Sequence, residues 1–181
     1  PEVDLSLARL VEADLSGATL TRGYLTDPKL RRAILRRADL TKVSMSKANF
    51  VRANLTEAVL VGADMSETVL IGANLTGVDL TRADLSRANL SGANLTGADL
   101  SRAELWGANL TGANLSGATL RRTDLWGATL TGAVLARADL TEANLSGVAA
   151  ERVDWYRANL TDAVVFGATG VPLEEATGPL H

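Results

Sequence analysis

The side chains that could do chemistry in this sequence are mainly carboxylates, hydroxyls and amides that recur at fixed spacing. The chain has no Cys and one His, His181, so Cys nucleophiles, thiolate metal sites, His-based triads and multi-His metal centres are excluded. The Ser and Thr residues have no His or Cys near them in the repeated region and no obvious activating base. We therefore expect no catalytic residues, no metal site and no cofactor.

One set of carboxylates recurs every twenty residues, and its members are Asp64, Asp84, Glu104 and Asp124. An acidic ladder of this kind could imitate the phosphates of duplex DNA. Arginines stand two residues before three of these acids, at Arg82, Arg102 and Arg122. We therefore favour the alternative, a solvated ladder whose acids are neutralised locally by the arginines. A shorter acidic series consists of Asp79 and Asp99 with Asp39 and Asp139, and Val59 and Thr119 interrupt it.

Exposed aromatic side chains form a second candidate site. Trp106 and Trp126 are twenty residues apart, each is followed by Gly, and Phe166 falls in the same series. Tyr156 also falls on an outward position. Because Trp is enriched at the energetic centres of protein interfaces, we interpret these residues as candidates for partner binding. Lateral packing is the alternative.

A five-residue period positions all of these side chains and runs unbroken from Leu5 to Val165. Of its 33 pentads, 27 have Leu at the position divisible by five, and 24 have Ala two residues earlier. Asp, Asn or Thr mostly stands between them, and Ser or Thr and then Gly, Arg or Glu follow the Leu. The consensus is A(D/N)L(S/T)(G/R).

Neither a straight helix nor a straight strand can use this pattern. Five helical residues advance by roughly 500°, which would spread Leu around the whole surface. In a strand, Leu residues five apart would point to opposite faces. An extended three-residue piece followed by a two-residue corner keeps every Ala and Leu inside. Since outward residues recur most clearly at a spacing of twenty, the sequence predicts four pentads per coil.

The A(D/N)L(S/T)(G/R) repeat resembles the pentapeptide-repeat family. The resemblance implies an all-β fold, a right-handed quadrilateral parallel β-helix, here with about eight coils. It also implies a specific activity, because some members inhibit or protect DNA gyrase by mimicking DNA and thereby confer quinolone resistance. Three features depart from those members: Leu fills the core where they frequently have Phe, no loop interrupts the pentads, and arginines flank the acidic ladder.

The two ends of the chain deviate from the repeat. We expect the β-helix to span residues 1–169 and residues 170–181 to form a cap, with one helical turn at 173–176. Trp155 occupies an inward position and is predicted to plug the core beside Ala150. Pro28 and Leu7 mark the irregular first coils, which we interpret as adaptation to the end of the rod. A homodimer through a terminal coil is a further expectation.

Charge divides along the chain. Residues 1–55 hold ten basic and six acidic residues, whereas residues 56–181 hold eight and fifteen, which gives the net charge of −3. The basic part lacks interleaved aromatics, which disfavours a nucleic-acid partner. No apolar run is long enough to span a membrane, and we expect a cytoplasmic protein. The sequence thus predicts a non-catalytic structural or protein-interaction scaffold, with a DNA-mimicking gyrase inhibitor or protector as the alternative.

Overall fold

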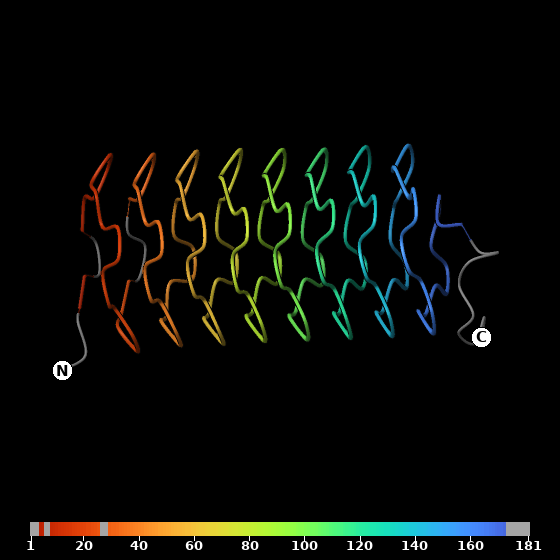
Figure 1. Cartoon of the computed structure of the whole chain (residues 1–181), viewed down its shortest axis with the longest axis horizontal. Coiled ribbons are helices and arrows are strands. Elements are labelled where there is room, and N and C mark those ends of the chain that lie inside the picture. Colours follow the sequence, from red (N-terminus) through yellow and green to blue (C-terminus); the bar gives the residue numbers. More distant parts are fainter. Residues whose placement is uncertain (1–3, 6–7, 26–28, 173–181) are drawn as a thin grey trace.

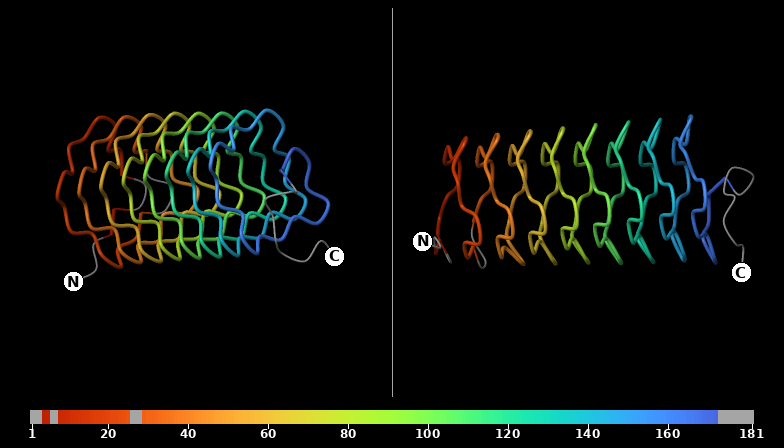
Figure 2. Two further views of the ribbon diagram at one scale, coloured as in Figure 1. Left: turned by 45° about the vertical axis from the view of Figure 1, so that its right-hand side comes forward. Right: turned by 60° about the horizontal axis from the view of Figure 1, so that its bottom comes forward.

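The computed structural model describes residues 4–5, 8–25 and 29–172, which form a rod of stacked coils. The coils succeed one another from the red end to the blue end in Figures 1 and 2. Parallel β-bridges run from Asp4↔Tyr24 to Ala149↔Thr169, and each joins two residues that are twenty apart. Four pentads therefore make one coil, and the described residues contain no α-helix.

In a consensus pentad each of the five backbone N–H groups has a defined hydrogen-bond acceptor, as residues 93–97 show. Ala93 N–H donates to Leu90 C=O across the corner, at 2.9 Å. The N–H groups of the next two residues and of the last one donate to neighbouring coils, at 2.7–3.0 Å. The remaining N–H, that of Thr96, donates to Asn94 Oδ1 at 3.1 Å. Since a buried or half-buried N–H needs an acceptor, an Asp or Asn at this position of a pentad is part of the backbone network.

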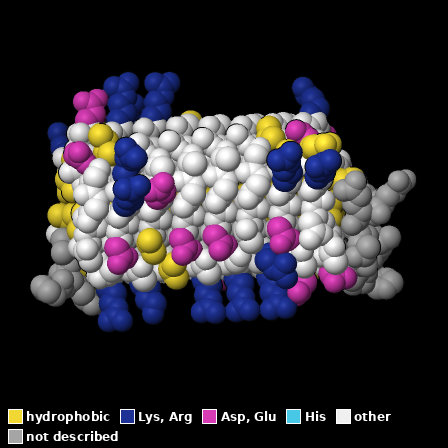
Figure 3. Space-filling model, in the orientation of Figure 1, with side chains coloured by type: hydrophobic (Ala, Val, Ile, Leu, Met, Phe, Trp, Pro, Cys, Tyr) yellow, Lys and Arg dark blue, Asp and Glu magenta, His cyan; other side chains and the backbone are white. Residues whose placement is uncertain are grey.

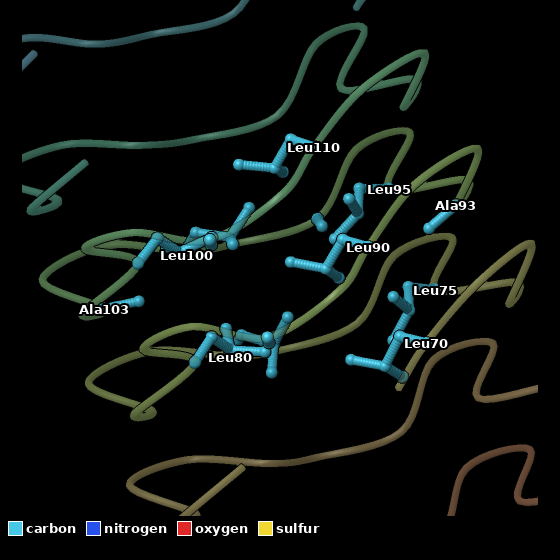
Figure 4. Packing of buried hydrophobic residues seen from close by; sticks show 14 of the residues in the cluster. Leu70, Leu75, Leu80, Leu90, Ala93, Leu95, Leu100, Ala103 and Leu110 are labelled. Atoms are coloured by element: carbon cyan, nitrogen blue, oxygen red, sulfur yellow. The ribbon is translucent and has the colours of Figure 1, made fainter. Parts of the chain in front are cut away.

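Ala and Leu side chains fill the interior of the rod, as predicted. Leu70, Leu90 and Leu110 stack on successive coils (Figure 4), and all three are fully buried. Two threonines replace Ala in the core, and their hydroxyls are satisfied: Thr68 Oγ1 donates to Met65 C=O and Thr123 Oγ1 to Leu100 C=O, both at 2.7 Å. The core is therefore mainly aliphatic, and the buried polar side-chain groups of the described residues are all paired.

The corner hydroxyls and the corner backbone have a regular arrangement. Many of the Ser and Thr hydroxyls donate to the preceding Asp or Asn side chain, as Thr96 Oγ1 does to Asn94 Oδ1 at 2.6 Å. The second corner residue has a positive φ, and Arg, Glu and Lys adopt it as well as Gly, for example Arg82 at 58°. This is the pattern of a type II turn, and it points long charged side chains away from the rod.

The last described coil closes around Trp155. Its ring is half-buried against the core, and its Nε1–H donates to Gly170 C=O at 3.0 Å. Gly170 has a φ of 72° and lies so close to the preceding coil that a Cβ there would be 2.4 Å from Ala150 O. The following Val171 is buried. The helical turn expected at 173–176, together with Leu7 and Pro28, lies outside the described residues.

Candidate protein-interaction surfaces

The four corners of a coil carry different side chains, and residues twenty apart share a corner. The Trp corner comprises 106–107, 126–127, 146–147 and 166–167. The Arg corner comprises 31–32, 51–52 and 71–72. Between successive corners lie the extended segments, whose central residues form the faces. The acidic face is the series Asp64, Asp84, Glu104 and Asp124, and it adjoins the Trp corner. Figure 3 shows charged side chains set in rows along the rod.

The Trp corner exposes two large aromatic side chains. Trp126 is 56% exposed and Phe166 is 65% exposed, and every second corner residue from 107 to 167 in this series is Gly. Trp106 behaves differently, because the Arg87 guanidinium covers its ring at 4.5 Å and leaves it half-buried. The expectation that both indoles lie uncovered over a glycine surface was wrong for Trp106. The accessible aromatic surface thus consists mainly of Trp126 and Phe166.

Tyr156 does not belong to this surface. It is 57% exposed, and the Arg157 guanidinium lies 5.1 Å from its ring centre. Its corner is two corners away from that of Phe166, so the two side chains project from diagonally opposite edges of the rod. The sequence candidates for partner binding therefore divide between two separate surfaces.

The acidic face is not neutralised by the arginine column, which corrects the sequence expectation. None of its four carboxylates forms a salt bridge with a residue that the structure describes. Asp64 and Asp84 instead accept the backbone N–H of the corner residue that follows, at 3.0 and 2.8 Å. Asp124 accepts from Trp126 N–H and Asn144 Nδ2, and Glu104 is exposed. The acidic face therefore has no cationic partner within salt-bridge distance among the described residues.

Charged corner residues pair with the equivalent residue of the next coil instead. Arg122 donates two hydrogen bonds to Glu142, at 2.7 and 3.0 Å. The same spacing of twenty joins Arg37 to Glu57, and Glu12 to Arg32. The hydrogen bond from Arg122 lowers the pKa of Glu142 below its ordinary value. Pairing thus follows the outward direction of the positive-φ residues rather than proximity within a pentad.

The shorter acidic series has one salt bridge at its C-terminal end. Asp139 accepts from Arg121 at 3.1 Å and from the hydroxyl and amide of Thr141. Burial raises the pKa of Asp139, but the hydrogen bonds from Thr141 and Arg121 outweigh it, so the pKa lies below its ordinary value. Thr141 is buried beside it. This series therefore takes part in the packing between coils.

The structure also gathers arginines that sequence reasoning treated as one diffuse basic region. Arg31, Arg32 and Arg52 line a pocket of 250 Å³ at the Arg corner, together with Val51 and Ile71. The lysines of the basic region fall on other corners or faces, because their numbers belong to other series. This grouping could have been predicted from the sequence, because Arg32 and Arg52 are twenty residues apart and therefore share a corner.

No group of three or more acidic or His side chains is placed to hold a metal ion among the described residues. No helix within them is long and apolar enough to cross a membrane.

The repeat, the twenty-residue bridges and the aliphatic core correspond to a known family. The family model of pentapeptide repeats matches eight copies, over residues 24–56, 48–87, 88–127, 120–154 and 138–168. The chain belongs to the pentapeptide repeat family. This membership confirms the resemblance found in the sequence. The comparison with curated protein sequences found no significant match.

Solved structures of pentapeptide repeat β-helix proteins are similar to this chain. HetL, involved in heterocyst differentiation regulation in the cyanobacterium Nostoc, is 29% identical over 91% of this chain and 90% of its own, with a TM-score of 0.51. A thylakoid-lumen protein of Arabidopsis thaliana is 29% identical over 58% of this chain and 73% of its own, with a TM-score of 0.55. QnrB1, a plasmid-mediated fluoroquinolone resistance protein, is 19% identical over 99% and 88%, with a TM-score of 0.51, and supports the fold alone.

Proposed function

We propose that this pentapeptide repeat protein is a non-catalytic scaffold that binds a protein partner through the Trp corner. The exposure of Trp126 and Phe166 carries this proposal. The two side chains are separated by two coils, roughly 10 Å at the spacing of stacked β layers. Large aromatic side chains are costly to leave in water and are enriched at interface centres.

The surroundings of the two rings favour a flat protein surface as the partner. Gly127, Gly147 and Gly167 leave no side chains beside the rings at the second corner positions. The half-buried Val164 and Ala149 lie on the two faces that meet at this corner. A partner could therefore approach the backbone closely and bury both rings, which is how aromatic anchors stabilise interfaces.

The chemistry of the repeat supports a role without catalysis. The hydroxyls and amides of the corners are used in the backbone network, as Thr96 and Asn94 show. The carboxylates of the acidic face stand on a convex surface rather than in a cleft. HetL, which is similar to this chain, is a pentapeptide repeat protein involved in the regulation of heterocyst differentiation.

Alanine variants test the Trp corner. The tagged protein, the variant W126A/F166A and the control Y156A are used to capture proteins from the cells that produce this chain, and quantitative mass spectrometry compares them. We expect at least one protein to be captured by the wild type and Y156A and lost with W126A/F166A. Identical captured sets would refute the proposal. Self-association through the same corner, seen by analytical ultracentrifugation, would make the partner a second copy.

A second candidate function is DNA-mimicking inhibition or protection of DNA gyrase. The observation in its favour is that Asp64, Asp84, Glu104 and Asp124 form no salt bridge in the described structure, so no arginine occupies their carboxylates. Successive carboxylates are one coil apart, roughly 4.8 Å along the rod. Phosphates of one DNA strand recur about every 3.4 Å along the helix axis, so the carboxylate series would match such a strand only in part.

A supercoiling assay with purified gyrase, with and without a quinolone, tests this second candidate. Inhibition or drug protection that weakens when the four acids are changed to Lys would support it. A matched control changes Glu12, Glu57, Glu151 and Asp154 to Lys, because these acids lie on the two corners opposite the acidic face or on the face between those corners. No effect of the wild type, or equal loss in both charge variants, would exclude it.

We also propose the finer architecture that the sequence suggests. Residues 1–169 would form about eight coils, and residues 170–181 a cap. The hydrogen bond from Trp155 to Gly170 and the burial of Val171 support a cap that starts at residue 170. Trp155 would then plug the core, as predicted. A cytoplasmic location and a homodimer through a terminal coil stay predictions.

A further inference from the structure

The Arg corner carries a second candidate interface, independent of the Trp corner. Its pocket of 250 Å³ is lined by three guanidinium groups and two aliphatic side chains, namely Arg31, Arg32, Arg52, Val51 and Ile71. Arg32 has a salt bridge to Glu12 at 3.2 Å, and neither Arg31 nor Arg52 has one among the described residues. Two cationic groups at this pocket are therefore available to a ligand.

Backbone donors at the same corner also lack a protein acceptor. In most pentads an Asp or Asn side chain accepts the first corner N–H, as Asn49 accepts from Val51 at 3.1 Å. The residues at the equivalent positions before Arg31 and Ile71 are Lys29 and Val69, which cannot accept this bond. No described residue accepts from the N–H of Arg31 or of Ile71. In many other pentads a carboxylate or amide oxygen fills this place, as Asp84 does for Ser86.

A second basic pocket lies at the next corner along the chain, across the extended segment 33–35 from the Arg corner. Arg36 and Arg37 line a pocket of 320 Å³ together with Ser16 and Gly17. Arg37 pairs with Glu57 at 2.6 Å, and the N–H of Arg36 has no acceptor among the described residues, because Ile34 replaces the Asp or Asn. The extended segment 33–35 separates the two pockets, so they are roughly 10 Å apart.

We propose that the Arg corner binds an acidic peptide segment of a protein partner, with a carboxylate in the place that an Asp side chain fills in other pentads. Arg31 and Arg52 would hold the carboxylate in a planar, charge-assisted arrangement, and the N–H of Arg31 would donate to it. The N–H of Ile71 lies two coils further along the rod and would donate to another acceptor of the same peptide. A second carboxylate roughly 10 Å away would reach Arg36 across the face. An apolar side chain next to the first carboxylate would pack on Val51 and Ile71.

The apolar lining distinguishes this partner from other anions. Val51 is half-buried and Ile71 is 40% exposed at the pocket, and Val11 is exposed in the same corner series. A phosphate backbone or a small inorganic anion would leave these aliphatic groups in water. Among the residues lining the two pockets there is no aromatic side chain on which a nucleic-acid base could stack. An acidic segment that also carries Leu or Val satisfies both kinds of group.

Fluorescence anisotropy with designed peptides tests the proposal. The probe is a labelled twelve-residue peptide of alternating Glu and Leu, with two controls in which Gln replaces Glu or Ser replaces Leu. The protein variants are R31E/R52E and V51S/I71S, with R82E/R102E as the matched control. The control reverses the same number of exposed arginines on another corner. Glu already occupies the positive-φ position at Glu57, so the substitution at Arg52 suits the backbone.

We expect the Glu–Leu peptide to bind the wild type and R82E/R102E alike, and to bind R31E/R52E at least about tenfold more weakly. The Gln peptide should lose most of the binding, whereas the Ser peptide and V51S/I71S should each lose part of it. Circular dichroism and thermal melts establish that the variants fold. The proposal is overturned if the wild type does not bind the peptide or if R82E/R102E weakens binding as much as R31E/R52E. Tighter binding of single-stranded DNA or phosphatidylserine vesicles to the same arginines would also overturn it.

Discussion

Replacing Asn94 by Ala should destabilise the protein by about 2 kcal/mol, because two hydrogen bonds end on its Oδ1 atom and each contributes about 1 kcal/mol. The donors are the N–H of Thr96 at 3.1 Å and its hydroxyl at 2.6 Å. Asn94 is half-buried, so water only partly replaces the lost acceptor. For a chain of this length, the loss corresponds to a decrease in Tm of about 4–8 °C.

Thermal and urea unfolding followed by circular dichroism measure this change. The matched control is Thr129→Ala, since Thr129 is a half-buried residue at the same pentad position, and it accepts no hydrogen bond from Thr131 N–H. We expect the control to change the free energy of unfolding by less than about 0.5 kcal/mol. Equal destabilisation by the two substitutions would refute the assignment of Asp and Asn as acceptors in the backbone network.

Three further predictions concern the core, the last coil and the charged corners. Leu100→Ala, at a fully buried position, should lower the free energy of unfolding by about 3–5 kcal/mol in urea unfolding. Gly170→Ala should lower Tm more than Gly97→Ala, because both have positive φ but only Gly170 would place a Cβ 2.4 Å from a backbone oxygen. The lowered pKa of Glu142 means that its pair with Arg122 contributes stability above the ordinary value of 4.5 and loses it as pH falls through the lowered pKa. In a pH series of thermal melts, Glu142→Gln should therefore lower Tm more at pH 7 than at pH 3, and an equal effect at both would contradict the assignment.

The sequence predicted the inward positions and the coil because one arrangement alone satisfies both the five-residue period and the twenty-residue series. Leu100 and Ala103 are buried where the period places them. The use of Asn94 as a backbone acceptor was missed, although the repetition of Asp and Asn before Ser and Thr was the signal. The role of the Asp and Asn side chains could be predicted by assigning a hydrogen-bond acceptor to each backbone N–H of the corner.

The surface could be predicted only in part, because side-chain direction depends on the corner conformation. Arg122 was expected to neutralise Asp124, two residues away, but its positive φ of 57° accompanies pairing with Glu142 on the next coil. Arg87 covers Trp106, which spacing alone does not indicate. Tyr156 and Trp126 are thirty residues apart, which is not a multiple of twenty. Their position on different corners could therefore be predicted from the sequence.

Photo-crosslinking from single positions tests the proposed interaction scaffold most directly. Benzoylphenylalanine is introduced at position 126, 166 or 156 of the full chain in the producing cells, and all three native side chains are exposed aromatics. The account predicts that one partner protein crosslinks at positions 126 and 166 and does not crosslink at position 156. Absence of any crosslink at positions 126 and 166, or the same products at all three positions, would contradict it.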